Sequence, residues 1–255
     1  MMTDLSITIV AYNNEEDVTK AVCSIMEHTA LSMSKKIYLV DNSTHPNTLS
    51  ALENRFPEVT YIKMERNLGF GRGHNQVLPL LDSKYHAIVN PDIILTEDSF
   101  SVLVDFLNKN AYGMVIPKLL DTDGNLQAVY RRELTVWDMF IRFFLKKGFK
   151  KRKAFHTLQD MDFTKSFPVP FAQGSFLVVR TALFKELEGF DERFFMYVED
   201  ADLCKRVNAC SSLYYCPDTA VIHKWEKGSH KDKSLRKEHI RSMFLYFNKW
   251  GWKLW

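Results

Sequence analysis

Three carboxylates in the second half of the chain are the residues best suited to acid–base chemistry. They are Glu199, Asp200 and Asp202, and they follow the apolar aromatic run Phe194-Phe-Met-Tyr-Val198. The spacing of apolar residues after them predicts a helix that begins around the acids. Carboxylates in the first turn of a helix face free N–H groups and the positive end of the helix dipole, which favours their ionised form. An ionised carboxylate beside an apolar pocket can take a proton from a hydroxyl nucleophile, and Asp200 is our candidate for that role.

Helix capping is the simpler interpretation of these acids, because capping residues are far commoner than catalytic bases. An isolated acidic triplet favours it. The other motifs of the chain favour catalysis instead.

The elements that must position the acids alternate between strands and helices in the first half of the chain. Apolar β-branched runs predict strands, and apolar residues three or four positions apart predict helices. The predicted strands cover 6–12, 36–41, 59–64 and 85–90, and the predicted helices cover 15–29 and 49–56. Such an alternation indicates a parallel sheet covered on both faces. We therefore expect an α/β fold with a Rossmann-like, mostly parallel central sheet flanked by helices.

Polar residues follow three of the predicted strands at one edge of this sheet. They are Tyr12-Asn13, Asp41-Asn42 and Asn90-Pro-Asp92. Function gathers at the carboxyl ends of the strands in such sheets, so these groups should form one cleft. Asp92 could hold a divalent metal against phosphates. His223, after a further apolar strand, is a candidate second ligand, although a lone histidine there is more often structural.

A glycine-rich segment, Asn67-Leu-Gly-Phe-Gly-Arg-Gly-His-Asn-Gln76, superficially matches a dinucleotide-binding fingerprint. The match fails, because the third glycine of that fingerprint would fall on His74 and the segment does not follow the first strand. Its glycines instead allow tight turns and a close approach of the backbone to a ligand.

Taken together, these segments resemble the inverting glycosyltransferases of family 2, which have the GT-A fold, and in particular a bacterial rhamnosyltransferase-like subgroup. The matching pieces are Ile9-Val-Ala-Tyr-Asn13, Val40-Asp-Asn-Ser43, Asn67-Leu-Gly-Phe70 with Asn75, Asn90-Pro-Asp92, Gly174-Ser-Phe-Leu-Val-Val-Arg180, Phe190-Asp-Glu192, Phe195-Met-Tyr-Val-Glu-Asp-Ala-Asp-Leu203 and His223. They occur in the order typical of the family and span most of the chain.

The resemblance implies a binding site for a nucleotide-sugar donor. The implied donor-binding residues are Tyr12, Asn13, Asp41, Asn67, Gly69, Asn75, Asn90 and Gly174. Asp41 would bind the pyrimidine, and Tyr12 and Asn13 would line the nucleotide pocket. Asn67, Gly69 and Asn75 would shape the loop beside the ribose and the diphosphate.

The resemblance also implies the catalytic and metal-binding groups. Asp200 corresponds to the catalytic base, with Glu199 beside it. Asp92 stands at the last position of the D-x-D metal motif, whose first position is Asn90 here, so one expected carboxylate is missing. A divalent cation, Mn²⁺ or Mg²⁺, at Asp92 and His223 would neutralise the departing diphosphate, and a single in-line displacement would invert the anomeric carbon.

Two basic, aromatic-rich stretches hold most of the positive charge. Residues 131–156 contain nine Lys and Arg against two acids, and residues 224–255 contain nine against three, although the whole chain carries only +3. Basic amphipathic helices that bear Trp and Phe bind anionic membrane surfaces. Packed aromatics with solvated lysines are the alternative, and no recognised motif supports nucleic-acid binding. No apolar run approaches the roughly 20 residues needed to cross a bilayer.

We therefore expect a cytoplasmic protein, peripheral at the inner face of the cell membrane, that acts on a glycan or a polyprenyl-diphosphate-linked glycan. The expected organisation is a GT-A domain over 1–230, with a nucleotide-binding half (1–95) and an acceptor half (96–230), and an amphipathic helical extension over 231–255. Two other functions stay open. A non-catalytic module would bind a nucleotide-sugar or glycan, and a nucleotidyltransferase would leave the acids after Tyr197 without a role.

Overall fold

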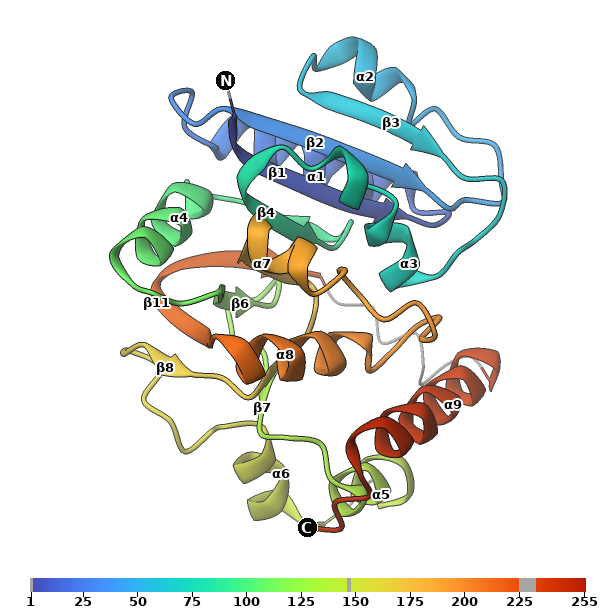
Figure 1. The fold of residues 1–255 in the computed structure, drawn as a ribbon, viewed down its shortest axis with the longest axis vertical. Coiled ribbons are helices and arrows are strands. Elements are labelled where there is room, and N and C mark those ends of the chain that lie inside the picture. The colour runs from blue at the N-terminus through green and yellow to red at the C-terminus, as the bar shows by residue number, and fades with distance from the viewer. Residues whose placement is uncertain (1, 146–147, 225–232) are drawn as a thin grey trace.

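The computed structural model describes residues 2–145, 148–224 and 233–255, and a nine-stranded sheet runs through them. Its strands are β1 (Thr3–Ala11), β2 (Lys35–Asp41), β3 (Val59–Lys63), β4 (Ser83–Val89), β5 (Ile93–Ile94), β6 (Met114–Leu120), β8 (Phe167–Pro168), β10 (Phe176–Arg180) and β11 (Leu213–His223). The main path has the order β3-β2-β1-β4-β10-β6-β11-β5, and β8 pairs with β11 (Figure 1). A small second sheet joins β7 (Tyr130–Arg131) to β9 (Phe171–Ala172).

The expected parallel sheet is confirmed for β1 to β4, which pair in parallel and place Ala11 beside Asp41. The rest of the sheet is mixed. β10 runs antiparallel between β4 and β6, and β5 and β8 run antiparallel to β11. β5 follows β4 after only three residues, yet it pairs with β11 and not with β4, and Ile93 lies opposite His223. This pairing brings His223, at the end of β11, close to the segment that follows β4.

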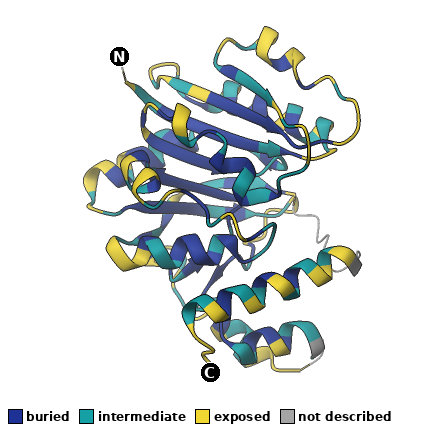
Figure 2. Cartoon of the chain, turned by 45° about the vertical axis from the view of Figure 1, so that its right-hand side comes forward, coloured by how far each residue is buried: buried dark blue, intermediate teal, exposed yellow. Residues whose placement is uncertain are grey.

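Helices cover both sides of the sheet, with α1 behind it and α3, α7 and α8 in front in Figure 1. The helices of this layer system are α1 (Glu15–His28), α2 (Ala51–Arg55), α3 (Phe70–Asn75), η1 (Leu78–Leu80), α4 (Ser99–Lys109), α7 (Thr181–Glu186) and α8 (Glu199–Cys210). α1 buries Val18, Val22 and Ile25, the face that its apolar spacing predicts. The central strands are buried over most of their length, as Figure 2 shows.

Three further helices form a group at the lower end of Figure 1: α5 (Val136–Phe144), α6 (Lys150–His156) and α9 (Lys233–Trp250). The residues after α9 return to the start of α5, where the Val136 N–H donates to the Lys253 carbonyl at 2.9 Å. Within the described chain, no helix is both long and apolar enough to cross a membrane. The expected boundary at residue 230/231 lies outside the described residues.

Candidate active site

The turn before α8 has an unusual backbone that aims the acidic residues. Tyr197 and Val198 both have φ of 69°, in the left-handed region, which costs roughly 1–2 kcal/mol per residue. Neighbouring elements hold the turn in place. The Met196 carbonyl accepts a hydrogen bond from the Ser242 hydroxyl of α9 at 2.8 Å, and the Tyr197 ring stacks on His239 at 4.5 Å. As predicted, α8 begins at Glu199.

Asp200 lies in a pocket and is held by backbone donors. Its carboxylate accepts N–H bonds from Gly174 at 3.1 Å and from Ala201 at 2.8 Å. Burial raises the pKa of Asp200, although these bonds and the nearby Arg131 and Arg142 oppose the rise. The helix terminus was expected to favour ionisation, so the direction of this shift is a correction: loss of water outweighs the helix terminus here. Gly174 serves this carboxylate, since a Cβ on it would lie 3.1 Å from Asp200 Cβ.

Glu199 lines the same pocket in a drier environment. It is 5% exposed, and its Oε2 has no hydrogen-bond partner among the described residues. Burial first, and then the charge of Asp200, raises the pKa of Glu199 well above its ordinary value. The pKa of both adjacent carboxyls is therefore raised, and the rise is the larger for Glu199, which has fewer hydrogen-bond donors around it.

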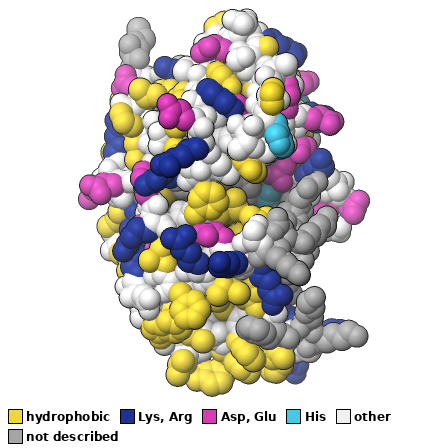
Figure 3. Space-filling model, turned by 90° about the vertical axis from the view of Figure 1, so that its right-hand side faces the viewer, with side chains coloured by type: hydrophobic (Ala, Val, Ile, Leu, Met, Phe, Trp, Pro, Cys, Tyr) yellow, Lys and Arg dark blue, Asp and Glu magenta, His cyan; other side chains and the backbone are white. Residues whose placement is uncertain are grey.

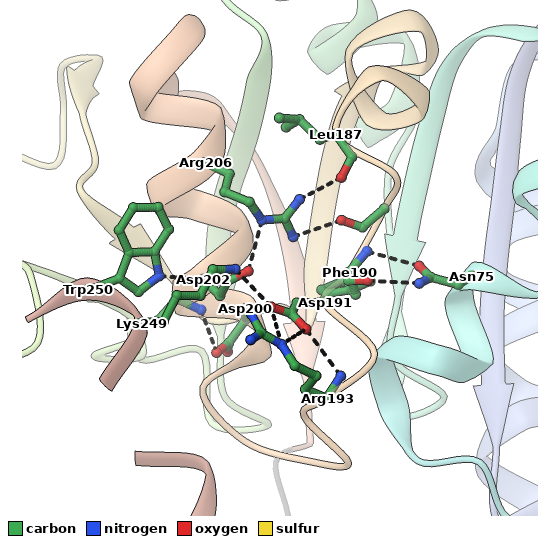
Figure 4. A network of polar contacts seen from close by, with 12 residues as sticks. Asn75, Leu187, Phe190, Asp191, Arg193, Asp200, Asp202, Arg206, Lys249 and Trp250 are labelled. Carbon is green, nitrogen blue, oxygen red and sulfur yellow. Dashed lines mark hydrogen bonds and ion pairs between the residues drawn. The ribbon is translucent and has the colours of Figure 1, made fainter. Parts of the chain in front are cut away.

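Asp202, the third acid of the triplet, faces away from this chemistry. Its buried carboxylate accepts from Arg206 at 2.8 Å, from Trp250 at 2.8 Å and from Lys249 at 2.6 Å (Figure 4). Arg206 also donates to the Leu187 carbonyl at 2.7 Å. Asp202 thus ties α8 to α9.

The predicted metal ligands lie together at the ends of β4 and β11. His223 Nε2 is 3.5 Å from Asp92 Oδ1. Gln127, which the sequence did not indicate, fixes the orientation of the His223 ring. Its amide nitrogen donates to the His223 carbonyl at 2.7 Å, so its Oε1 faces His223 Nδ1 at 2.8 Å. Since an amide oxygen only accepts, Nδ1 must donate. With Nδ1 committed to Gln127, Nε2 is the ring nitrogen that faces the Asp92 carboxylate, an arrangement that suits a shared cation.

The donor set around this pair fits a weakly held divalent cation. No group of three or more His, Cys, Asp or Glu that could bind a metal occurs in the described part of the chain. Asn90 lines the pocket next to Asp92, and its buried Oδ1 has no hydrogen-bond partner there. Two protein ligands leave a hard cation dependent on further oxygens, such as those of a diphosphate.

One cavity of about 350 Å³ joins the acids to the metal pair. It is lined by Asn90, Asp92, Gly174, Glu199, Asp200 and His223, all of which the sequence indicated. Gln173 and Ser175 also line it, and each has a buried side-chain oxygen without a hydrogen-bond partner in the described residues. Buried polar atoms are rarely left unpaired, so these atoms mark a place for a polar ligand.

The other predicted donor residues lie outside this cavity. Asp41 is fully buried and accepts from the Ser43 N–H, Asn47, Tyr61 and Lys63. Burial opposes ionisation, yet these hydrogen bonds lower the pKa of Asp41. All of these donors come from the protein, so Asp41 fixes the loop after β2 in this structure.

Tyr12 and Asn13 form the exposed rim above that loop. Tyr12 is 46% exposed. Asn13 Oδ1 accepts from the Thr44 and His45 N–H groups at 3.1 and 3.2 Å. The two strand ends are therefore linked, as one cleft requires.

The glycine-rich segment packs against the turn before α8. Asn67 Oδ1 accepts from the Gly69 N–H at 2.8 Å, and Gly69 has φ of 84°. A Cβ on Gly69 would come within 2.1 Å of the Phe195 carbonyl, so only glycine fits. Asn75 exchanges two hydrogen bonds with the Phe190 backbone, at 2.8 and 2.9 Å. These residues support the acidic turn.

Three arginines of the first basic stretch turn toward the interior. Arg131 and Arg142 line the cavity beside Asp200, and Arg152 forms an ion pair with a buried Asp138 at 2.6 Å. Lys146 and Lys147 lie outside the described residues. The sequence contained these arginines but gave no signal that their side chains turn inward.

An aromatic patch, consisting of Trp137, Phe140, Phe149 and Trp255, occupies the outer side of α5. Trp137 lies 5.6, 5.8 and 5.3 Å from the rings of the other three. Phe140, Phe149 and Trp255 are 43%, 46% and 70% exposed. Figure 3 shows hydrophobic side chains gathered at this lower end, with Lys and Arg side chains above them.

Comparisons with known proteins identify related sequences. A family model described as "Glycosyl transferase family 2" matches residues 6–188. The chain is 27% identical to the N-acetylglucosaminyl-diphospho-decaprenol L-rhamnosyltransferase of Mycobacterium tuberculosis, with 96% of this chain and 84% of that protein covered. It is 29% identical to Rhamnosyltransferase WbbL of Escherichia coli, with 70% and 69% covered. These matches confirm the resemblance that the motifs indicated.

Solved structures share the fold. The mannosyltransferase PcManGT from Pyrobaculum calidifontis, in complex with GDP-Man and Mn²⁺, matches with a TM-score of 0.67 at 14% identity over 98% of this chain and 65% of that one. GalNAc-T7 with UDP, GalNAc and Mn²⁺ matches with a TM-score of 0.69 at 16% identity over 97% of this chain, which spans 50% of that one. The predicted GT-A architecture, a central sheet flanked by helices, is confirmed.

Proposed function

This chain belongs to glycosyl transferase family 2, and we propose that it is an inverting, metal-dependent transferase that moves a sugar from a nucleotide-sugar to a hydroxyl of a glycan or lipid-linked glycan. The first candidate donor is dTDP-L-rhamnose, because the two relatives above are rhamnosyltransferases by name. The observation that carries the proposal is a single pocket that contains Asp92, His223 and Asp200.

Asp200 is the proposed general base. The residue is half-buried, and its carboxylate is oriented by the N–H groups of Gly174 and Ala201. It can take the proton of an acceptor hydroxyl as that oxygen attacks the anomeric carbon. In this proposal Glu199 keeps its proton, so Asp200 supplies the negative charge at this point of the pocket. The protonated Glu199 can donate a hydrogen bond to a sugar oxygen. Attack opposite the departing diphosphate inverts the carbon.

Asp92 and His223 are the proposed holders of Mn²⁺ or Mg²⁺. The cation would act as a Lewis acid that neutralises the departing diphosphate. Gln127 fixes the His223 ring for this purpose. Because the chain offers few ligands, cation affinity should appear mainly with nucleotide present.

We assign the donor nucleotide to the half formed by residues 1–95, with Tyr12 and Asn13 at the rim, and the acceptor to residues 96–230. Residues 231–255 complete the same domain, since α9 supports the turn before α8. In this scheme Asp41 holds the loop after β2 in the conformation that contacts the pyrimidine of the donor.

A non-catalytic module that binds a nucleotide-sugar is the second candidate. It is favoured by Asn90 at the position where the metal motif has a carboxylate, and by the lack of a larger ligand cluster in the described chain. Such a module would bind nucleotide without turnover.

Turnover on a panel of nucleotide-sugars with Mn²⁺ separates the two candidates. The purified protein should release nucleoside diphosphate from one donor in the presence of acceptor, and chelator should stop the release. Asp92→Ala and His223→Ala should raise the Mn²⁺ concentration needed for half-maximal rate. Saturable nucleotide binding without release from any donor would instead support the module.

The aromatic patch is a proposed contact with a membrane surface. Exposed Trp and Phe beside basic residues suit the boundary between lipid headgroups and acyl chains. Because several arginines of the basic stretches point inward, aromatic insertion should contribute more to binding than charge.

Liposome sedimentation tests this contact. Trp255→Ala combined with Phe140→Ala should reduce binding to anionic liposomes severalfold. Leu31→Ala, which removes an apolar side chain that is 97% exposed but lies outside the patch, should not. If the wild-type protein binds none of the liposomes, even at low salt, the membrane role is refuted.

A further inference from the structure

Two arginines in the pocket have no role in the mechanism above. Arg131 belongs to β7, opposite Phe171 of β9, and its guanidinium lies 5.5 Å from the Phe171 ring. Arg142 belongs to the last turn of α5. Both side chains line the cavity that contains Asp200.

These two cations differ from several other arginines of the chain, which are ion-paired. Arg132, Arg152 and Arg206 each hold a carboxylate at 2.6 to 2.8 Å. Across the described residues, neither Arg131 nor Arg142 has a hydrogen bond or ion pair to a carboxylate. Arg131 is only 9% exposed, and burial lowers its pKa to about 9. A buried cation without a bound anion is costly, so the site suits an anion that a ligand brings.

Asp200 compensates only part of this charge. Its oxygens accept from backbone N–H groups and not from the arginines. The other carboxylate of the lining, Asp92, faces His223 Nε2 at 3.5 Å, so around Asp200 two guanidiniums share one ionisable partner and positive charge is left at that place in the pocket. The planar fork of a guanidinium matches phosphate oxygens.

The position of the pair indicates which phosphates it meets. The diphosphate of the donor would meet the cation proposed at Asp92 and His223. α5 connects the arginines to the surface: Met139 and Arg142 line the pocket, while Trp137 and Phe140 belong to the aromatic patch. An acceptor sugar at Asp200 would therefore place its carrier along α5.

We propose that Arg131 and Arg142 form a subsite for the diphosphate that links an acceptor sugar to its carrier. The inference rests on the proposed function, because Asp200 marks the position of the acceptor hydroxyl. The subsite would select acceptors joined to a carrier through a diphosphate over neutral glycans.

Two synthetic acceptors with the same sugar test the subsite, one a short alkyl diphosphate and the other a neutral alkyl glycoside. Wild type should prefer the diphosphate acceptor in kcat/KM. Arg131→Gln and Arg142→Gln should each reduce that preference about tenfold or more, as expected for loss of a charged hydrogen bond. Arg132→Gln is the matched control, because the Arg132 guanidinium binds Asp160 outside the pocket, and it should keep the wild-type preference.

Calorimetry identifies the source of the phosphates. The two pocket variants should weaken binding of butyl diphosphate more than binding of a nucleoside diphosphate with Mn²⁺. A larger loss of affinity for the nucleoside diphosphate would assign the arginines to the donor and overturn the inference. Equal losses of kcat/KM on the diphosphate and the neutral acceptor would overturn it as well. If wild type transfers to no acceptor while butyl diphosphate binding still depends on both arginines, the proposed function fails and the subsite stands.

Discussion

The two sides of the first turn of α8 hold carboxylates in opposite environments. On the outer side, Asp202 is buried and receives hydrogen bonds or ion pairs from Arg206, Lys249 and Trp250. On the pocket side, Asp200 receives only backbone N–H groups and Glu199 retains an unpaired oxygen among the described residues. The comparison teaches that burial alone does not define a catalytic acid. The acid with matched partners stabilises the fold, and the acids with few partners remain available for chemistry.

Asp200→Asn should have the largest effect on activity. The amide keeps the shape of the side chain but cannot take a proton, so kcat should fall about 10²- to 10⁴-fold. Donor binding, measured by calorimetry with Mn²⁺, should stay close to wild type. Near-normal turnover would return Asp200 to a capping role and remove the contrast between the two sides.

Asp202→Asn should instead act on stability. It removes the carboxylate that pairs with Arg206 and leaves Lys249 with Asp191 alone, and breaking a buried pair in this way costs about 3–5 kcal/mol. Urea unfolding measures the loss. Asp160→Asn, which breaks a more exposed pair with Arg132, is the control and should cost at most about 1 kcal/mol. Equal losses in the two variants would contradict a stabilising role for the outer side.

Gln127→Leu should weaken metal binding although Gln127 is not a proposed metal ligand. It removes the acceptor that orients the His223 ring, and loss of such a partner typically costs about 10- to 100-fold in metal affinity. Mn²⁺ titration followed by electron paramagnetic resonance, with nucleoside diphosphate present, measures this directly. Gln76→Leu changes a residue just after α3 whose side chain donates to the Arg72 carbonyl, and it should leave the affinity unchanged.

Glu199→Gln should stabilise the protein in a pH-dependent way. Burial raises the folded-state pKa of Glu199 above its ordinary value of 4.5, so the folded chain keeps this proton where the unfolded chain has lost it. Wild type therefore loses stability as pH rises above about 4.5, by about 1.4 kcal/mol for each unit between the two pKa values. The amide has no proton to lose. The difference in Tm should vanish below pH 4 and favour the variant near neutrality; a difference independent of pH would show that Glu199 ionises normally.

The sequence predicted the first half of the fold well because its strands and helices follow simple periodic patterns. The strands containing Ile9 and Val40 and the start of α8 at Glu199 lie where those patterns placed them. The two-residue strands could not be predicted, since β5 and β9 are too short to show a period. Their pairing depends on segments far away in the sequence.

The candidate site was predictable in part for the same reason. Asp92, Asp200 and His223 stand in recognisable motifs, and the structure brings them to one pocket. Gln127 and Arg131 stand in no motif, and only the paired strands β7 and β9 place Arg131 beside Asp200. The left-handed backbone at Val198 contradicts local preference, since a β-branched residue rarely adopts it, and tertiary contacts impose it.

The contacts that hold the turn before α8 also set an order of assembly. The ribosome completes the strands of the central sheet before it adds Ser242, His239 and Lys249, which fix Met196, Tyr197 and Asp202. A nascent chain that has emerged only as far as β11 would already contain every strand and every proposed catalytic and metal-binding residue. Its acidic turn would still be free to relax from the left-handed conformation. Activity should therefore arise during translation as a late event, after folding of the sheet and on docking of α9.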